Sequence, residues 1–173
     1  MLELNSVEQA ITHWDGKSTS DIGEVYTRFC DESGFVNTII ALASAEKLQK
    51  GATWLLKRHL EVAGGRKGEH CSEILGLLPQ LARNNWEAKL HLLQCMPYLV
   101  IEVKDKQRVE RFLRQCLMNS NKFVRAWSYH GFYELSMQFP EYTKETKQFF
   151  EMAKKDEAPS VLARIRKIEK LGF

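Results

Sequence analysis

The sequence predicts an all-α protein whose helices form a right-handed α-α superhelix of about four helix pairs. Apolar residues recur at i, i+3, i+4 and i+7 spacing along most of the chain, which indicates amphipathic helices. No segment alternates with a period of two, and no Asn-Gly or Asp-Gly turn marks a hairpin. The pattern Trp-Leu-Leu-Lys-Arg-His at 54–59 returns at 86–91 as Trp-Glu-Ala-Lys-Leu-His, and weaker echoes begin at 123 and 160. Repetition at steps of 32 to 37 residues is typical of stacked two-helix units.

Turn-forming residues divide most of the chain into helix pairs. We expect pairs at about 35–50 with 53–63, 70–83 with 86–101, 105–118 with 122–138, and 142–155 with 159–171. The turns inside the pairs are short and polar, so the two helices of a pair should be antiparallel neighbours. The glycine-rich stretch 64–68 is a loop, and residues 1–34 should form an N-terminal cap of one or two less regular helices.

Two prolines fall inside otherwise helical patterns. Pro79 and Pro97 each remove a backbone donor and clash with the preceding turn. We therefore expect a kink in the helix at both positions.

Length and composition indicate a single domain, residues 1–173. Apolar residues make up 44% of the chain and charged residues 27%, which is typical of a folded globular protein. No Gly/Ser/Pro-rich linker separates two halves. The predicted repeats occupy about 35–64, 69–101, 104–139 and 141–173.

The localisation predicted from the sequence is cytoplasmic. The first residues lack the basic and apolar regions of a signal peptide, and no apolar run approaches the length of a membrane span. Of the four cysteines, Cys71, Cys95 and Cys116 fall on apolar helical stripes. This placement predicts buried, reduced thiols instead of a disulfide framework.

Charge is unevenly distributed along the chain. Residues 1–100 carry 10 Lys/Arg and 12 Asp/Glu, whereas residues 101–173 carry 15 and 10. The basic C-terminal part is compatible with an acidic partner or a phosphate backbone. A solvated helical surface would have the same composition.

Residues 121–127 and 156–164 resemble the turn and second-helix opening of HEAT-like repeats, which form armadillo-type superhelices. The resemblance covers about residues 35–171, although its first unit is short. It implies a scaffold whose second helices line a concave face that binds a partner.

On the second helices, Lys57, Lys89 and Arg125 fall in one column when aligned on the repeated pattern. The residues predicted to line a mildly basic groove are Trp54, Lys57, Arg58, Lys89, His91, Arg125, Tyr129 and Arg164. Such a groove would bind an acidic peptide or a phosphodiester backbone through charge-assisted hydrogen bonds. In the alternative interpretation, basic residues such as Arg125 brace neighbouring repeats through turn carbonyls or carboxylates.

The aromatic and metal-ligating residues have structural alternatives. Most tryptophans and tyrosines stand at helical spacing and should pack in the core, whereas Trp54 shares a face with charged residues and is a candidate contact residue. His91 and Cys95 stand four residues apart, and His70 and Cys71 are adjacent, but the usual ligand spacings are missing. We expect no metal and no cofactor.

The sequence has no phosphate-binding loop, dinucleotide-binding glycine pattern or nucleophile elbow. The chain is similar in predicted fold class, basic groove and tryptophan content to the HEAT-like alkylpurine DNA glycosylases. That resemblance implies a catalytic aspartate near the tryptophans. The positions one turn after them are Arg58, Leu90 and Gly131, and the nearest carboxylates on these helices are Glu61, Glu87 and Glu134.

We therefore predict a non-catalytic interaction module that binds a protein or peptide partner, acidic in character, through its second helices. No catalytic residue is predicted, and no membrane contact is expected. A DNA-binding protein related to the alkylpurine DNA glycosylases is the alternative.

Overall fold

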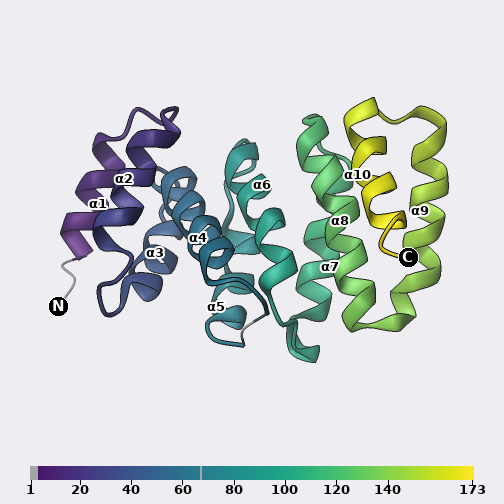
Figure 1. Cartoon of the computed structure of the whole chain (residues 1–173), viewed down its shortest axis with the longest axis horizontal. Helices are drawn as coiled ribbons and strands as arrows, with labels where there is room; N and C mark the ends of the chain where they lie inside the picture. The colour runs from purple at the N-terminus through teal and green to yellow at the C-terminus, as the bar shows by residue number, and fades with distance from the viewer. Residues whose placement is uncertain (1–3, 67) are drawn as a thin grey trace. The chain divides into compact units, whose positions relative to one another are not determined.

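The computed structural model describes residues 4–66 and 68–173, and within them the chain forms ten α-helices and no β-strand (Figure 1). The prediction of an all-α protein is confirmed. The helices belong to two compact units, residues 1–100 and 101–173, called here the N-terminal and C-terminal units. The predicted single continuous repeat domain would join these units and stays a prediction.

The N-terminal unit is organised around α4. Its helices are α1 Leu4–His13, α2 Thr19–Phe29, α3 Phe35–Ala43, α4 Gln49–Ala63, α5 Cys71–Gly76 and α6 Trp86–Cys95. Helix α4 packs against α2, α3 and α6. Its fully buried Leu55 and Leu56 share the core with Ile39 of α3 and Leu93 of α6.

The first predicted pair has different boundaries in the structure. Helix α3 ends at Ala43 instead of near residue 50, and α4 begins at Gln49 instead of residue 53. The buried Gln49 amide explains where α4 starts, because its Nε2 donates to the Gln80 carbonyl at 2.9 Å and its Oε1 accepts from the Ala82 N–H at 3.0 Å. These partners lie more than 30 residues away, so local sequence does not reveal them.

The two internal prolines end helices instead of kinking them, so that prediction is wrong. Pro79 lies in a short 3₁₀ turn, Leu78–Gln80, that follows α5. Pro97 lies in a similar turn, Met96–Tyr98, that follows α6. A proline lacks the N–H that would continue the helix but is tolerated in the first turn of a new segment.

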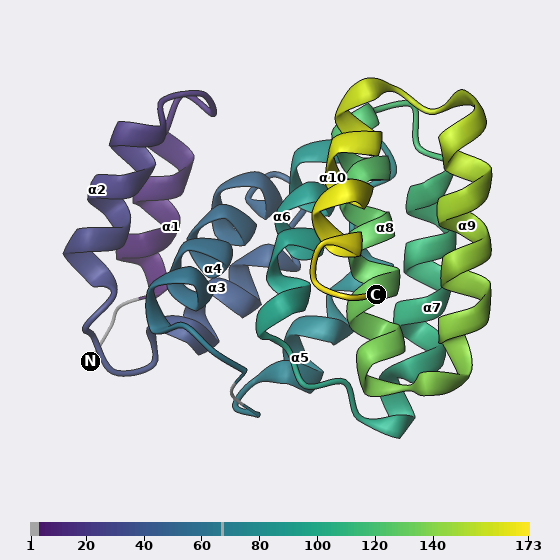
Figure 2. The ribbon, with the colours of Figure 1, turned by 45° about the vertical axis from the view of Figure 1, so that its right-hand side comes forward.

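The C-terminal unit is organised around α8. Its helices are α7 Val103–Leu117, α8 Lys122–Gln138, α9 Thr143–Asp156 and α10 Pro159–Glu169. These bounds agree closely with the predicted ones. Helix α8 packs against α7, α9 and α10, which lie around it in Figure 2. Tyr129, Phe150, Val161 and Ile165 lie in the core that α8 shares with α9 and α10.

Alternate helices lie side by side within each unit, with the chain running in the same direction. Between α7 and α9, three contacts advance together along both helices or the short turn before α9: Lys106 with Glu141, Glu110 with Tyr142, and Arg114 with Glu145. Between α4 and α6, Lys50 contacts Glu87 and Thr53 contacts His91. Because the contacts advance together, both pairs of helices are parallel.

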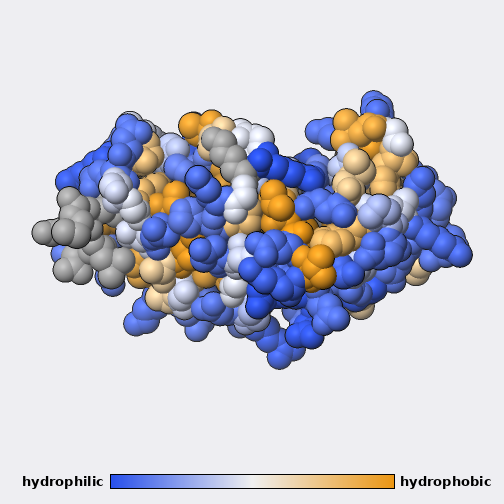
Figure 3. All heavy atoms as spheres, turned by 90° about the horizontal axis from the view of Figure 1, so that it is seen from below, coloured by the Kyte–Doolittle hydropathy of each residue, from blue (hydrophilic) through white to orange (hydrophobic). Residues whose placement is uncertain are grey.

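The cysteines agree with the prediction. Cys71, Cys95 and Cys116 are buried, and all four cysteines are free. In the described part of the chain, no helix has the length and apolar character needed to cross a membrane. Figure 3 shows one face, on which hydrophilic side chains cover most of the surface and hydrophobic patches lie between them.

Candidate functional site

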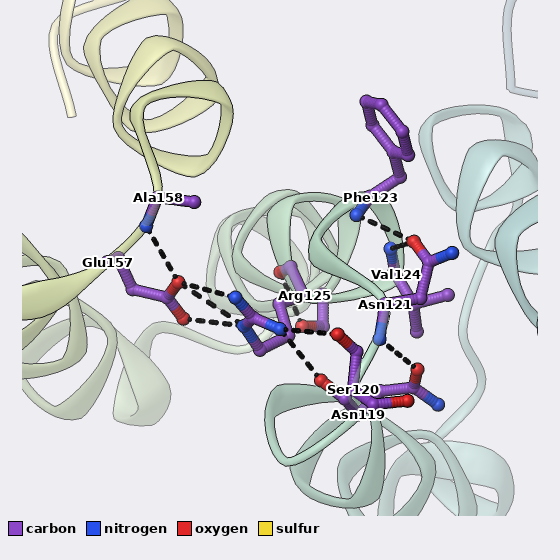
Figure 4. Close-up of polar contacts among 9 residues, drawn as sticks. Asn119, Ser120, Asn121, Phe123, Val124, Arg125, Glu157 and Ala158 are labelled. Atoms are coloured by element: carbon purple, nitrogen blue, oxygen red, sulfur yellow. Dashed lines mark hydrogen bonds and ion pairs between the residues drawn. The ribbon is translucent and has the colours of Figure 1, made fainter.

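Arg125 lies in a clamp between two turns of the C-terminal unit. Asn121 caps α8 by accepting hydrogen bonds from the N–H groups of Phe123 and Val124, and this places Arg125 on the first turn of the helix. The Arg125 Nη1 donates to the carbonyls of Asn119 at 2.9 Å and Ser120 at 3.0 Å (Figure 4). Its Nε and Nη2 donate to the Glu157 carboxylate at 2.9 and 3.1 Å. The guanidinium is therefore engaged on both sides.

Electrostatics strengthens this clamp. Burial acts to raise the pKa of Glu157, but the Arg125 hydrogen bonds and the Ala158 N–H hold that pKa below its ordinary value. The hydrogen bonds with Glu157 likewise raise the pKa of Arg125. Arg125 thus has the bracing role that the alternative interpretation of the sequence gave it.

Removal of the clamp should reduce stability. We expect Arg125→Met to lower the free energy of unfolding by about 1–2 kcal/mol, because charge-assisted hydrogen bonds are lost and Glu157 is left partly buried without its cation. Urea unfolding followed by circular dichroism measures the change. Arg111→Met, at an exposed position of α7, is the matched control and should change it by less than about 0.5 kcal/mol. Equal effects of the two variants would show that the clamp contributes nothing.

Three further predicted groove residues also have internal partners. The Lys89 Nζ donates to the Arg83 carbonyl at 2.6 Å, and the His91 Nδ1 lies 3.0 Å from the Thr53 Oγ1. The Tyr129 ring is buried against Phe150, and burial raises its pKa to about 12. Each of the three side chains is therefore held by at least one contact within its own unit.

The remaining residues of the N-terminal unit, Trp54, Lys57 and Arg58, line a hollow of about 400 Å³ between α2 and α4. Trp54 is half-buried, and the Lys57 Nζ lies 5.5 Å from its ring centroid and 3.4 Å from the Glu61 carboxylate. Arg58 is exposed, and within residues 4–66 and 68–173 it has neither a hydrogen bond nor an ion pair. Its guanidinium is available to a ligand in this hollow.

Hydroxyl groups and two carboxylates complete the hollow. The α2 side contributes Thr19, Ser20, Gly23, Glu24 and Thr27, and Glu61 stands on the α4 side. Gly23 faces the Trp54 ring, since a Cβ built there would lie 4.0 Å from its Cη2 atom. The arrangement offers an aromatic surface, hydroxyl groups and charges of both signs.

In the C-terminal unit, Arg164 contacts the ring of a tryptophan that was predicted to lie in the core. The Arg164 Cζ lies 3.9 Å from the centroid of the Trp127 ring. Among the described residues Arg164 has no hydrogen bond or ion pair, and burial lowers its pKa. Phe123, one helical turn before Trp127, is exposed, so this face of α8 is not fully covered.

No metal site emerges from the described side chains: among them, no group of three or more His, Cys, Asp or Glu residues could hold an ion. His91 and Cys95, the pair weighed from the sequence, belong to the interior of the N-terminal unit, where burial raises the pKa of the Cys95 thiol and lowers that of His91.

No protein-family model, curated protein or solved structure matches this chain.

Proposed function

We propose that the chain is a non-catalytic binding module of the HEAT-like class that recognises an acidic segment of a protein partner. The observation that carries the proposal is the contrast among the predicted groove cations. Lys57, Lys89 and Arg125 have internal partners, whereas Arg58 and Arg164 have none among the described residues and each lies beside a tryptophan.

The repeat class is supported by packing inside each unit. Parallel neighbours separated by 31 to 38 residues, as in Arg114 with Glu145 and Thr53 with His91, are expected when successive two-helix units stack in register. The Arg125 clamp is a contact of the same kind, because it ties the α7–α8 turn to the α9–α10 turn.

The acidic character of the partner follows from the two arginines. A guanidinium presents donors in a fixed fork that matches a carboxylate, and an adjacent aromatic ring adds apolar contact area. Arginine and tryptophan are also the residues on which binding energy concentrates in protein interfaces.

A DNA-binding relative is the second candidate, and the hollow of the N-terminal unit favours it specifically. Glu24 and Glu61 line the same hollow as Trp54 and Tyr26, so a carboxylate lies near an aromatic wall. Glu61 is paired with Lys57, which reduces its availability for stabilising a cationic sugar.

Fluorescence anisotropy with labelled polyglutamate and a labelled DNA duplex tests the proposal at about 50 and 200 mM salt. We expect polyglutamate to bind, with affinity weakened roughly tenfold by Arg58→Gln and by Arg164→Gln, because each removes a charge-assisted contact. Arg166→Gln changes the net charge equally at an exposed position of α10, and it should leave the affinity within about twofold.

Absence of polyglutamate binding, or equal losses in all three variants, would overturn the proposal. Tighter binding of the duplex, with a steep salt dependence, would favour the DNA-binding candidate. Glu61→Gln would then be the first variant for a base-release assay on alkylated DNA.

A further inference from the structure

Arg164 and Trp127 make a close cation–π contact. A separation of 3.9 Å between Cζ and the ring centroid is a van der Waals contact, well inside the range of cation–π interactions. Within the described part of the chain, the Arg164 N–H groups have no hydrogen-bond acceptor. These donors then remain available to a group that approaches beside the indole.

The Trp127 ring is held in place from within the unit. His130, one turn further along α8, packs against it with ring centroids 5.0 Å apart. The His130 Nε2 lies 3.1 Å from the Glu134 Oε1, and both side chains are nearly buried. The platform under Arg164 is therefore ordered before any ligand binds, which lowers the entropic cost of binding.

The polar groups around Arg164 are incompletely satisfied. Burial lowers the pKa of Arg164, and no carboxylate in the described part of the chain offsets this effect. Among the residues that the structure describes, the buried Oγ of Ser160, one turn earlier on α10, has no hydrogen-bond partner, and the buried His130 Nδ1 also has none. A desolvated cation without a counter-ion is costly in a folded protein, so an external anion would stabilise this site.

An exposed aromatic ring adjoins the platform. Phe123 precedes Trp127 by four residues on α8 and is 48% exposed. The Lys122 Nζ lies 5.4 Å from the centroid of its ring. Residues four apart on a helix are neighbours with Cβ atoms about 5–6 Å apart, which is close to the spacing of alternate side chains along an extended peptide.

We infer that Trp127, Arg164 and Phe123 form a docking site for an acidic peptide segment, in which a carboxylate binds the Arg164 guanidinium and a nearby apolar side chain covers Phe123. This inference rests on the proposed function, since both assume an acidic protein partner. It adds the contact residues in the C-terminal unit and the sequence character of the segment, an apolar residue beside an acidic one.

A peptide fits the immediate surroundings of Arg164 better than a nucleic acid does. A phosphate backbone is held by several solvent-facing cations, and the strength of binding grows with their number. Of the 15 Lys and Arg residues of the C-terminal unit, six are paired with its own carboxylates: Lys104, Lys106, Arg108, Arg114, Arg125 and Lys154. A single half-buried arginine next to an exposed aromatic ring matches one carboxylate with an apolar neighbour.

The test follows Trp127 directly by ¹⁹F NMR of the full chain labelled with 5-fluorotryptophan. Trp127→Phe identifies its resonance among the four tryptophans. The probe is a Ser/Gly peptide in which leucine stands two residues before glutamate, and two matched peptides replace the leucine by serine or the glutamate by glutamine. Thymidine oligonucleotide is a further probe.

We expect the leucine–glutamate peptide to shift the Trp127 resonance, and each matched peptide to need at least several-fold higher concentration. Arg164→Gln and Arg164→Lys should both weaken binding by about 10- to 100-fold, because lysine keeps the charge but loses the planar fork. Arg166→Lys is the matched control on the same helix and should have no effect. Phe123→Ser should weaken only the binding of peptides that contain leucine.

Three results would overturn the inference: an unmoved Trp127 resonance, wild-type affinity in Arg164→Lys, or a shift by the oligonucleotide at lower concentration than by the peptide. Polyglutamate binding that depends on Arg58 and not on Arg164 would leave the proposed function standing while this inference fails. Absence of binding by every acidic probe would remove both. Unfolding curves of the Arg164 variants separate lost binding from lost folding, and the matched peptides test the site with the unaltered protein.

Discussion

Gly131→Val should lower the free energy of unfolding of the C-terminal unit by about 3 kcal/mol, with a fall in Tm of about 12–24 °C. Gly131 lies inside α8, where a Cβ atom would stand 2.3 Å from the Leu113 Cδ2 of α7. Leu113 is fully buried and therefore has little room to move. Glycine is unfavourable within a helix by about 1 kcal/mol, so its presence here indicates that close packing of α7 and α8 outweighs helix propensity. Thermal unfolding followed by circular dichroism measures the effect.

Two companion variants identify the cause of this loss. Gly23→Ala changes a glycine inside α2 whose new Cβ would meet only the Trp54 ring, at 4.0 Å, so it should be neutral or stabilise by up to about 1 kcal/mol. Leu113→Ala removes the atom that the valine side chain introduced by Gly131→Val would strike. The double variant should therefore cost clearly less than the sum of the single ones. Additive costs would show that the valine acts through something other than this contact.

The C-terminal unit was the more predictable of the two because its local signals agree with its packing. Asn121 caps α8, and Pro159 stands at the first position of α10, so both helices begin where the sequence indicated. In the N-terminal unit, α4 begins without a side-chain cap at Leu48, and the buried Gln49 amide docks on a distant segment. Tertiary contacts of that kind leave no periodic trace in the sequence.

The sequence indicated which residue types would form the candidate site. It did not indicate which of the arginines are paired within the chain and which are available to a partner. Arg125 and Arg164 both follow a turn on a second helix, and sequence alone does not distinguish them. The difference comes from Glu157, which lies 32 residues after Arg125, and from Trp127, which lies 37 residues before Arg164. Helical periodicity favoured a core role for Trp127, because a half-buried ring on a packed helix has the same spacing as a buried one.

His91 was predicted to line the groove, but its ring lies in the interior of the N-terminal unit and contacts Thr53. The Thr53 hydroxyl has one hydrogen, and it donates this to the Gln49 carbonyl at 2.7 Å. The His91 Nδ1 is therefore the donor to the Thr53 oxygen at 3.0 Å, which places a proton on Nδ1. Desolvation lowers the pKa of His91 to about 3, and the nearby charges of Lys57 and Lys50 act in the same direction.

This lowered pKa should make the N-terminal unit sensitive to mild acid. In the unfolded chain a histidine titrates near pH 6.5, so below that pH the unfolded state binds a proton that the folded state does not. The stability is therefore fully present above pH 6.5 and is lost as the pH falls toward 3. Between pH 7 and pH 5 the free energy of unfolding should decrease by about 2 kcal/mol from this residue alone.

Urea unfolding at a series of pH values measures this dependence. His91→Asn should remove the decrease of about 2 kcal/mol between pH 7 and pH 5, because asparagine can still donate to Thr53 but does not titrate. Equal slopes in wild type and His91→Asn would show that His91 is not the group responsible.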